Sequence, residues 1–169
     1  MIVVLSDYMP GWVKMFEKEK ELITGKFPVK DFRIEHIGST AVPGLKAKPV
    51  IDMLIGLHRL PADMSPIVNC LESLHYQYIE KYNQVMPERR FFQKDADSIR
   101  THQIHLVAVD SDFWNRHLFF RNYLRKNPVA RLRYQELKTD LAKREWNSVN
   151  DYAEAKTSFI KSIEKLVNK

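Results

Sequence analysis

A single charged residue inside an apolar strand restricts the folds open to this chain. Residues Val50–Leu57 are apolar apart from Asp52, and a short apolar run of this kind is typical of a buried strand. An unpaired carboxylate is very costly to bury. We therefore expect Asp52 to face a cation, a cluster of hydrogen-bond donors or a metal ion, and we place any chemistry of the protein between Ile34 and Gly56.

The segment before this strand predicts another strand, followed by a turn of small residues. Residues Phe32–Ile37 are predicted to form the strand, and Gly38, Ser39 and Thr40 follow it directly. Small residues at the end of a strand let backbone N–H groups approach an anion closely. A turn of this composition alone is often only a helix cap, so a phosphate site here depends on Asp52 lying nearby.

The remaining pattern predicts a mixed β-sheet backed by helices, an α/β (α+β) fold, in a single domain over residues 1–169. Besides the two strands above, periodicity predicts strand-like residues at Ile2–Leu5, helices at Gly11–Ile23 and Met64–Leu74, extended pieces between Tyr76 and Lys94, and a strand at Gln103–Val109. Three further helices are expected to form a C-terminal pack, at Ser111–Lys126, Pro128–Trp146 and Asp151–Val167.

Composition favours an intracellular protein with anionic partners. The chain of 169 residues has one cysteine, Cys70, which excludes an intramolecular disulfide, so the cytoplasm is the expected compartment. No apolar window approaches the roughly 18 residues of a membrane span, so we expect no membrane partner. The formal net charge of +6 favours phosphorylated small molecules or nucleic acids, because a basic surface concentrates anions.

The motifs resemble those of two known groups of proteins. A Gly-Ser turn, twelve residues and then Asp52 in a strand are similar in spacing to nucleotidyltransferases of the polymerase-β-like fold. The strings Glu35–Leu45 and Ala47–Asp52 resemble the GrpB family of small bacterial proteins more closely, and later pieces agree with it: Phe120–Arg125, Tyr134–Lys138 and Tyr152–Lys156. The resemblance implies a nucleotidyltransferase-like fold. Because a similar domain is fused to dephospho-coenzyme A kinase in some bacteria, it also hints at nucleotide or coenzyme A metabolism.

The nucleotidyltransferase pattern is incomplete at its second metal-binding carboxylate. Asp52 and Leu54 share one face of the strand, so Leu54 stands where such an enzyme has a second acid, although two-metal phosphoryl transfer needs several anionic oxygens. His105 on a later strand could replace a further acid, and either Glu35 or His36 could add a ligand. A set of Asp52, His105 and Glu35 would suit zinc, manganese or nickel better than a magnesium pair. The alternative is a hydrogen bond between His105 and Asp52 with no metal.

Cations within apolar stripes indicate a common anionic target. One group lies in or beside the apolar stripes of the C-terminal helices and consists of Arg121, Lys138 and Lys156. A second group lies on a short basic and aromatic strand and consists of Arg89, Arg90 and Lys94. Each alone would be a snorkelling side chain or a charge that protects an edge strand. Together they favour a pocket for a phosphorylated ligand.

The sequence leaves three hypotheses for function. The first is a domain that binds a nucleotide-like or other phosphorylated small molecule, with the phosphates at Gly38 and Ser39. If it is an enzyme, nucleotidyl transfer is the reaction that the resemblance implies, and Asp52 and His105 are the candidate catalytic residues. The second is an inactive nucleotide or metabolite sensor, which Leu54 favours. The third is an RNA-binding module, which only the charge supports.

Overall fold

The computed structural model describes residues 1–168 and confirms the mixed α/β fold. Its five-stranded sheet has the order β1-β2-β5-β4-β3, in which β2 and β5 are parallel and the other neighbours are antiparallel. The strands are β1 (Phe32–Ile37), β2 (Ile51–Leu57), β3 (Gln77–Tyr78), β4 (Arg90–Ala96) and β5 (Ile99–Ala108). The apolar run that surrounds Asp52 is therefore a strand in the interior of the sheet.

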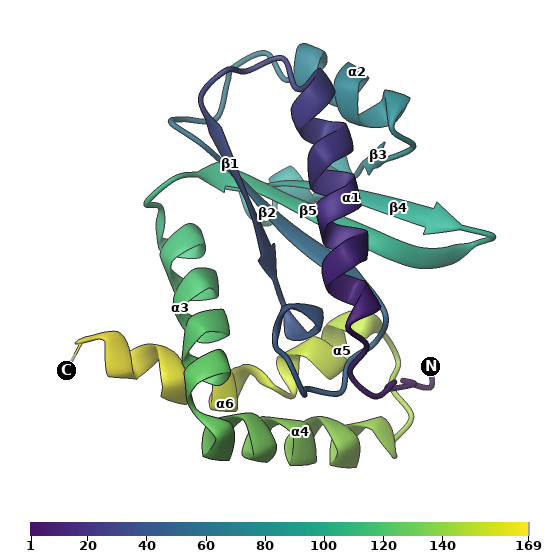
Figure 1. Cartoon of the computed structure of the whole chain (residues 1–169), viewed down its shortest axis with the longest axis vertical. Helices are drawn as coiled ribbons and strands as arrows, with labels where there is room; N and C mark the ends of the chain where they lie inside the picture. The colour runs from purple at the N-terminus through teal and green to yellow at the C-terminus, as the bar shows by residue number, and fades with distance from the viewer. Residues whose placement is uncertain (169) are drawn as a thin grey trace.

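Six α-helices surround this sheet in the part of the chain that the structure describes. They are α1 (Gly11–Lys26), α2 (Ser65–Ser73), α3 (Asp112–Lys126), α4 (Pro128–Ala142), α5 (Val149–Glu154) and α6 (Thr157–Glu164). Residues 1–168 also contain three short 3-10 helices, η1 (Ser39–Ala41), η2 (Glu80–Asn83) and η3 (Lys165–Asn168). Figure 1 shows α1 across the sheet and α4, α5 and α6 gathered below it. Within residues 1–168, no helix has both the length and the apolar character that a membrane span requires.

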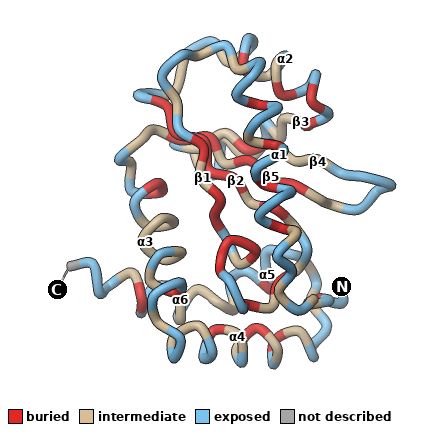
Figure 2. Tube along the Cα trace, in the orientation of Figure 1, coloured by how far each residue is buried: buried red, intermediate tan, exposed pale blue. Residues whose placement is uncertain are grey.

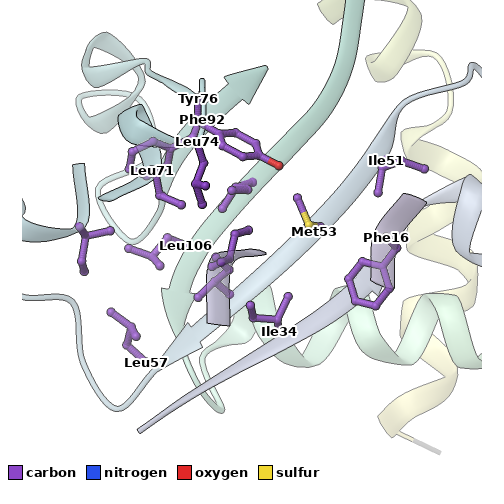
Figure 3. Close-up of a cluster of buried hydrophobic side chains, with 14 of the residues drawn as sticks. Phe16, Ile34, Ile51, Met53, Leu57, Leu71, Leu74, Tyr76, Phe92 and Leu106 are labelled. Atoms are coloured by element: carbon purple, nitrogen blue, oxygen red, sulfur yellow. The ribbon is translucent and has the colours of Figure 1, made fainter. Parts of the chain in front are cut away.

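The main core lies between the sheet and the N-terminal helices. Ile51, Met53 and Ile55 alternate along β2, are fully buried and pack in one cluster with Phe16 of α1 and Leu71 of α2 (Figure 3). Fully burying one such side chain is worth about 1.5–3 kcal/mol. This face of β2 therefore holds the sheet and α1 together, and it leaves the alternate residues of the strand for the opposite face.

The opposite face of β2 is covered by α3 at one end only. Leu54 is fully buried in a cluster with Phe113 and Trp114 of α3. At Gly56 a Cβ atom would lie 2.5 Å from the Trp114 ring, so only glycine permits this close contact. Every residue of β2 except Asp52 is buried (Figure 2). The end of β2 that carries Asp52 extends past α3, towards α4 and α5.

Some predicted boundaries differ from the structure. Residues Ile2–Leu5 form no strand; this end of the chain is held by a bridge between Ser6 and Ala47 and by backbone hydrogen bonds between Met1 and Trp146. β5 begins at Ile99 because the chain turns tightly from β4 at Asp97 and Ser98, whose φ angles are 50° and 64°. The third predicted C-terminal helix is two helices, α5 and α6, with a turn between them.

Candidate functional site

A pocket of about 210 Å³ lies at the Asp52 end of the sheet. It is bounded by the turn after β1, the loop that leads into β2, the sheet itself, and the helices α4 and α5. Its lining residues are Leu5, Ser39, Thr40, Ala47, Lys48, Val50, Asp52, Gln103, Lys138, Val149, Tyr152, Ala153 and Lys156. The structure thus brings five of the predicted site residues to one pocket: Ser39, Thr40, Asp52, Lys138 and Lys156.

The turn of small residues is held against Asp52 by its backbone geometry. Gly38 has a φ of 74° and a ψ of −175°, a combination that is essentially restricted to glycine. A Cβ atom at Gly38 would lie 2.7 Å from Asp52 Oδ2. Glycine at this position therefore permits both the turn and the close approach of the Asp52 carboxylate.

Thr40 ties the turn to the two strands that it connects. Its hydroxyl donates to the Val50 carbonyl at 3.1 Å and lies 3.0 Å from His36 Nε2. Because the hydroxyl proton is used on Val50, His36 Nε2 is the donor in the second bond. Burial lowers the pKa of His36 to about 4, with smaller effects from Asp52 and nearby arginines. His36 stacks on Phe16 on the core side of the sheet, so Glu35, not His36, shares a face with Asp52.

Two nitrogen donors approach one oxygen of the Asp52 carboxylate. His105 Nε2 lies 3.6 Å from Asp52 Oδ1. With the Gln103 amide oriented so that its nitrogen faces Asp52, Gln103 donates to the same oxygen at 2.9 Å, and its own oxygen accepts from Arg100 at 3.1 Å. The parallel register places Gln103 directly beside Asp52 on the sheet. Asp52 Oδ1 therefore accepts one hydrogen bond from β5, from Gln103, and the His105 imidazole lies close behind it.

Arg89 determines which nitrogen of His105 carries the proton. Its Nη1 lies 3.2 Å from His105 Nδ1, and a guanidinium group can only donate. Nδ1 is therefore the acceptor, and the proton of a neutral His105 lies on Nε2, towards Asp52. His105 stands behind Asp52 and is not among the residues that line the pocket. Arg89 contacts the far side of the His105 ring, so it is separated from Asp52 by that ring.

Three lysines converge on the pocket. Lys138 is 2% exposed, donates to Ser39 Oγ at 2.9 Å and also donates to the Lys46 carbonyl. Lys156 and Lys48 lie over the Tyr152 ring, with their Nζ atoms 4.3 and 5.5 Å from its centre. Burial, with repulsion from Lys156 and Lys48, lowers the pKa of Lys138 to about 7.

Electrostatics within the pocket are dominated by these cations. Burial and repulsion from Lys48 lower the pKa of Lys156 to about 8. Burial also lowers the pKa of Lys48. In both residues Asp52 acts in the opposite sense, because its negative charge favours the ammonium form. Among the described residues none of the three lysines has an ion pair within 4.0 Å, and Asp52 is the one carboxylate that lines the pocket.

Four predicted ligand cations lie away from this pocket: Arg89, which contacts His105, and also Lys94, Arg90 and Arg121. Lys94 projects to the core face of the sheet and pairs with Glu19 at 2.9 Å. Arg90 shares that face and donates to the Pro87 carbonyl at 2.6 Å. Arg121 of α3 donates to Glu35 at 2.7 Å and to the His36 carbonyl at 2.9 Å. The cations predicted to converge are therefore split between two faces of the sheet.

Lys48 and Tyr152 are two of the pocket residues that were not expected from the sequence. Lys48 lies in the loop between the Gly-Ser turn and β2, where no periodicity marks an inward residue. Tyr152 fits the apolar stripe of its helix, yet it lines the pocket, and its buried hydroxyl has no hydrogen-bond partner among the described residues. The proximity of Lys48 to the motif residues was the available signal in the sequence.

The side chains around Asp52 do not fit a two-metal centre. Leu54 occupies the neighbouring position on the same face and is fully buried. Glu35 is neutralised by Arg121 at 2.7 Å. Across residues 1–168 no group of three or more His, Cys, Asp and Glu side chains is arranged to hold a metal ion. Two-metal catalysis needs several anionic oxygens at one place, and this arrangement provides one carboxylate.

Known proteins share this chain's sequence and architecture. The family described as GrpB protein matches residues 2–166. The glutamate-rich protein GrpB of Alkalihalophilus pseudofirmus is 34% identical, over 95% of this chain and 93% of that protein. A UPF0157 protein of Halalkalibacterium halodurans is 35% identical, over 98% of this chain and 83% of that protein. The crystal structure of the conserved protein GrpB from Enterococcus faecalis has a TM-score of 0.83 and 35% identity, and covers 96% of this chain and 95% of that one. With the match extending over nearly every element described above, the chain belongs to the GrpB family.

Proposed function

We propose that the pocket binds the phosphate group of a nucleotide-like or other phosphorylated small molecule. The observation that carries this proposal is the convergence of Lys48, Lys138 and Lys156 on a pocket lined by only one carboxylate among the described residues. An ammonium group is costly to bury without a partner. A bound phosphate would supply the negative charge that these three groups lack.

Two polar groups beside the lysines support the same ligand. The Ser39 hydroxyl accepts from Lys138, which leaves its own proton available to a ligand oxygen. The buried Tyr152 hydroxyl also lacks a partner among the described residues, and such groups are normally paired with protein, water or ligand. A phosphate oxygen is an acceptor for both.

We favour binding over nucleotidyl transfer as the function. The family resemblance implies a nucleotidyltransferase-like scaffold, but Leu54 stands where that reaction needs a second acid. A sensor or carrier of a nucleotide or a coenzyme A-like metabolite requires only the pocket. An RNA-binding role is less well supported, because Lys48, Lys138 and Lys156 line a single pocket and do not form an extended stripe along the surface.

Binding is tested by thermal unfolding of the full chain with inorganic phosphate, AMP, ATP and coenzyme A, each with and without divalent cations, and with adenosine as the unphosphorylated control. A probe at 100 times its Kd should stabilise the fold by about 2.7 kcal/mol. We expect at least one phosphorylated probe to raise the Tm and adenosine to leave it unchanged. If adenosine stabilises as well as AMP, or if no phosphorylated probe stabilises, the proposal is wrong.

A pair of lysine variants locates the binding site. Lys156→Met removes a pocket cation, and Lys161→Met removes an exposed lysine of the next helix. We expect Lys156→Met to weaken binding of the best probe by at least about tenfold, the equivalent of about 1.4 kcal/mol. Lys161→Met should keep the Kd of the unmodified protein. Equal effects of the two substitutions would place the phosphate outside the pocket.

A further inference from the structure

We propose that this pocket holds its phosphorylated ligand without a divalent metal ion, with the ammonium groups of Lys48, Lys138 and Lys156 taking the place of metal cations. The inference rests on the proposed function. It specifies, in addition, which groups neutralise the charge of the bound phosphate. Asp52, the residue that would be the first metal ligand, serves as a hydrogen-bond acceptor in this arrangement.

The first argument concerns the oxygens of Asp52. Oδ1 accepts a hydrogen bond from the Gln103 amide nitrogen at 2.9 Å, and His105 Nε2 lies 3.6 Å from the same oxygen. The Arg89 contact keeps the His105 proton on Nε2, so this nitrogen presents a proton to Asp52 and no lone pair to a metal. Oδ2 lies against the backbone at Gly38. A cation at Oδ1 would have to displace two donors that β5 holds in place.

The second argument concerns the neighbours that would complete a metal shell. The face of the sheet that carries Asp52 also carries Glu35 and Leu54, which lie side by side in the antiparallel register. Leu54 has no ligand atom, and Glu35 is bound by the nearly buried guanidinium of Arg121, whose side chain is 10% exposed. A divalent ion beside Asp52 would find one carboxylate, because neither Leu54 nor the Arg121-bound Glu35 is free to supply a second ligand.

The third argument compares the charge of the pocket with that of its occupant. With all three lysines protonated, the pocket carries three positive charges against the one negative charge of Asp52. A divalent cation would add to this excess, whereas a phosphate dianion would cancel it. Opposite charges attract strongly where water is excluded. The same interaction would favour the protonated lysines, so binding should take up protons and weaken as the pH rises above neutrality.

The experiment measures the Kd of the same four phosphorylated probes by calorimetry at neutral pH, in excess EDTA and then in excess magnesium or manganese. We expect the best probe to bind with the same Kd, within about twofold, in EDTA and in metal. Binding that requires metal would overturn this inference and leave the proposed function intact. Absence of binding by all probes in every condition would refute the proposed function, and with it this inference.

Two variants that each remove one negative charge test whether Asp52 acts as a hydrogen-bond acceptor or as a metal ligand. Asp52→Asn keeps the shape of the side chain and removes its charge, and Glu154→Gln does the same at an exposed position of α5 beside the pocket. We expect Asp52→Asn to bind the probe in EDTA more tightly than the unmodified protein, by up to about tenfold, because the phosphate no longer faces a negative charge in the pocket, and Glu154→Gln to leave the Kd unchanged. A loss of binding in Asp52→Asn that tracks a loss of metal uptake, measured with manganese by electron paramagnetic resonance, would refute the inference.

Discussion

The ammonium group of Lys138 in α4 donates a hydrogen bond to the Ser39 hydroxyl at 2.9 Å, joining two residues that are 99 positions apart in the sequence. The same ammonium group donates to the Lys46 carbonyl in the loop after the turn. One buried lysine thus holds the C-terminal helices against the Gly-Ser turn. Its charge state is consequently linked both to ligand binding and to the stability of the fold.

The stability of the unliganded protein is expected to rise with pH because of Lys138. Burial and the nearby lysines lower its pKa from 10.5 to about 7, so between pH 7 and 10.5 the unfolded chain binds the proton that the folded chain has lost. Stability therefore increases with pH across this window, by up to about 1.4 kcal/mol per pH unit from this group. Lys138→Met should reduce the slope of the unfolding free energy against pH, which urea denaturation in phosphate-free buffer measures. Lys161→Met should retain it, and an equally steep slope in Lys138→Met would contradict the expectation.

Two glycine substitutions should have opposite effects on stability. Gly38→Ala places a Cβ atom 2.7 Å from Asp52 Oδ2 at a backbone angle that disfavours alanine, and we expect a loss of about 1–3 kcal/mol. At Gly25 in α1, a Cβ atom would meet nothing within 4 Å, so Gly25→Ala should stabilise by about 0.5–1 kcal/mol. Chemical denaturation measures both. A neutral Gly38→Ala would show that the turn tolerates a side chain against Asp52.

Thr40→Val tests the hydrogen bonds that join the turn to the strands. Valine keeps the shape of threonine but leaves His36 Nε2 and the Val50 carbonyl without their partner. Each buried unpaired group costs about 1–3 kcal/mol, so we expect a loss of at least about 1 kcal/mol in the free energy of unfolding. Thr24→Val, at an exposed position of α1, should change it by less than about 0.5 kcal/mol. Similar losses in the two variants would rule out a special role for the Thr40 hydroxyl.

The contact of Arg89 with His105 predicts a single tautomer of that imidazole. Because Arg89 Nη1 donates to Nδ1, the proton of neutral His105 should lie on Nε2, and nitrogen chemical shifts from NMR will report it. Arg89→Met removes the donor, and we expect the Nδ1 signal to move towards the value of a mixed population. Arg59→Met, at an exposed position, should leave the spectrum of His105 unchanged. A proton found on Nδ1 in the unmodified protein would contradict the assigned hydrogen bond.

The sequence was most informative where the two-residue alternation of a strand alone determined which side chains share a face. β1 spans Phe32–Ile37, and Asp52 and Leu54 share one face of β2, because strand alternation alone determines which side chains lie together. The shared face of Asp52 and His105 also follows from this rule once β2 and β5 are neighbours. These features required no knowledge of the loops.

Residues whose position depends on long-range pairing were harder to place. Arg90 and Lys94 were expected near Lys138, but the register of β4 with β5 directs them to the core face of the sheet. Lys48 lies in an irregular loop, so no period indicated its direction. The turn between α5 and α6 brings Lys156 over the Tyr152 ring, and neither proline nor glycine marks that break in the sequence. Such features are determined by the packing of the whole molecule.

The parallel pairing of β2 with β5 has a consequence for how the protein folds. β1 and β2 form one antiparallel pair and β4 and β5 another, and each pair joins segments that follow closely in the chain. The two pairs meet only where β2 contacts β5, with α2 and β3 in the intervening sequence, and such non-local contacts form slowly. Asp52 and Gln103, which both line the pocket, lie on opposite sides of this seam. The pocket therefore comes into existence only when the two halves of the sheet dock, so a bound ligand should slow unfolding without accelerating the steps that precede docking.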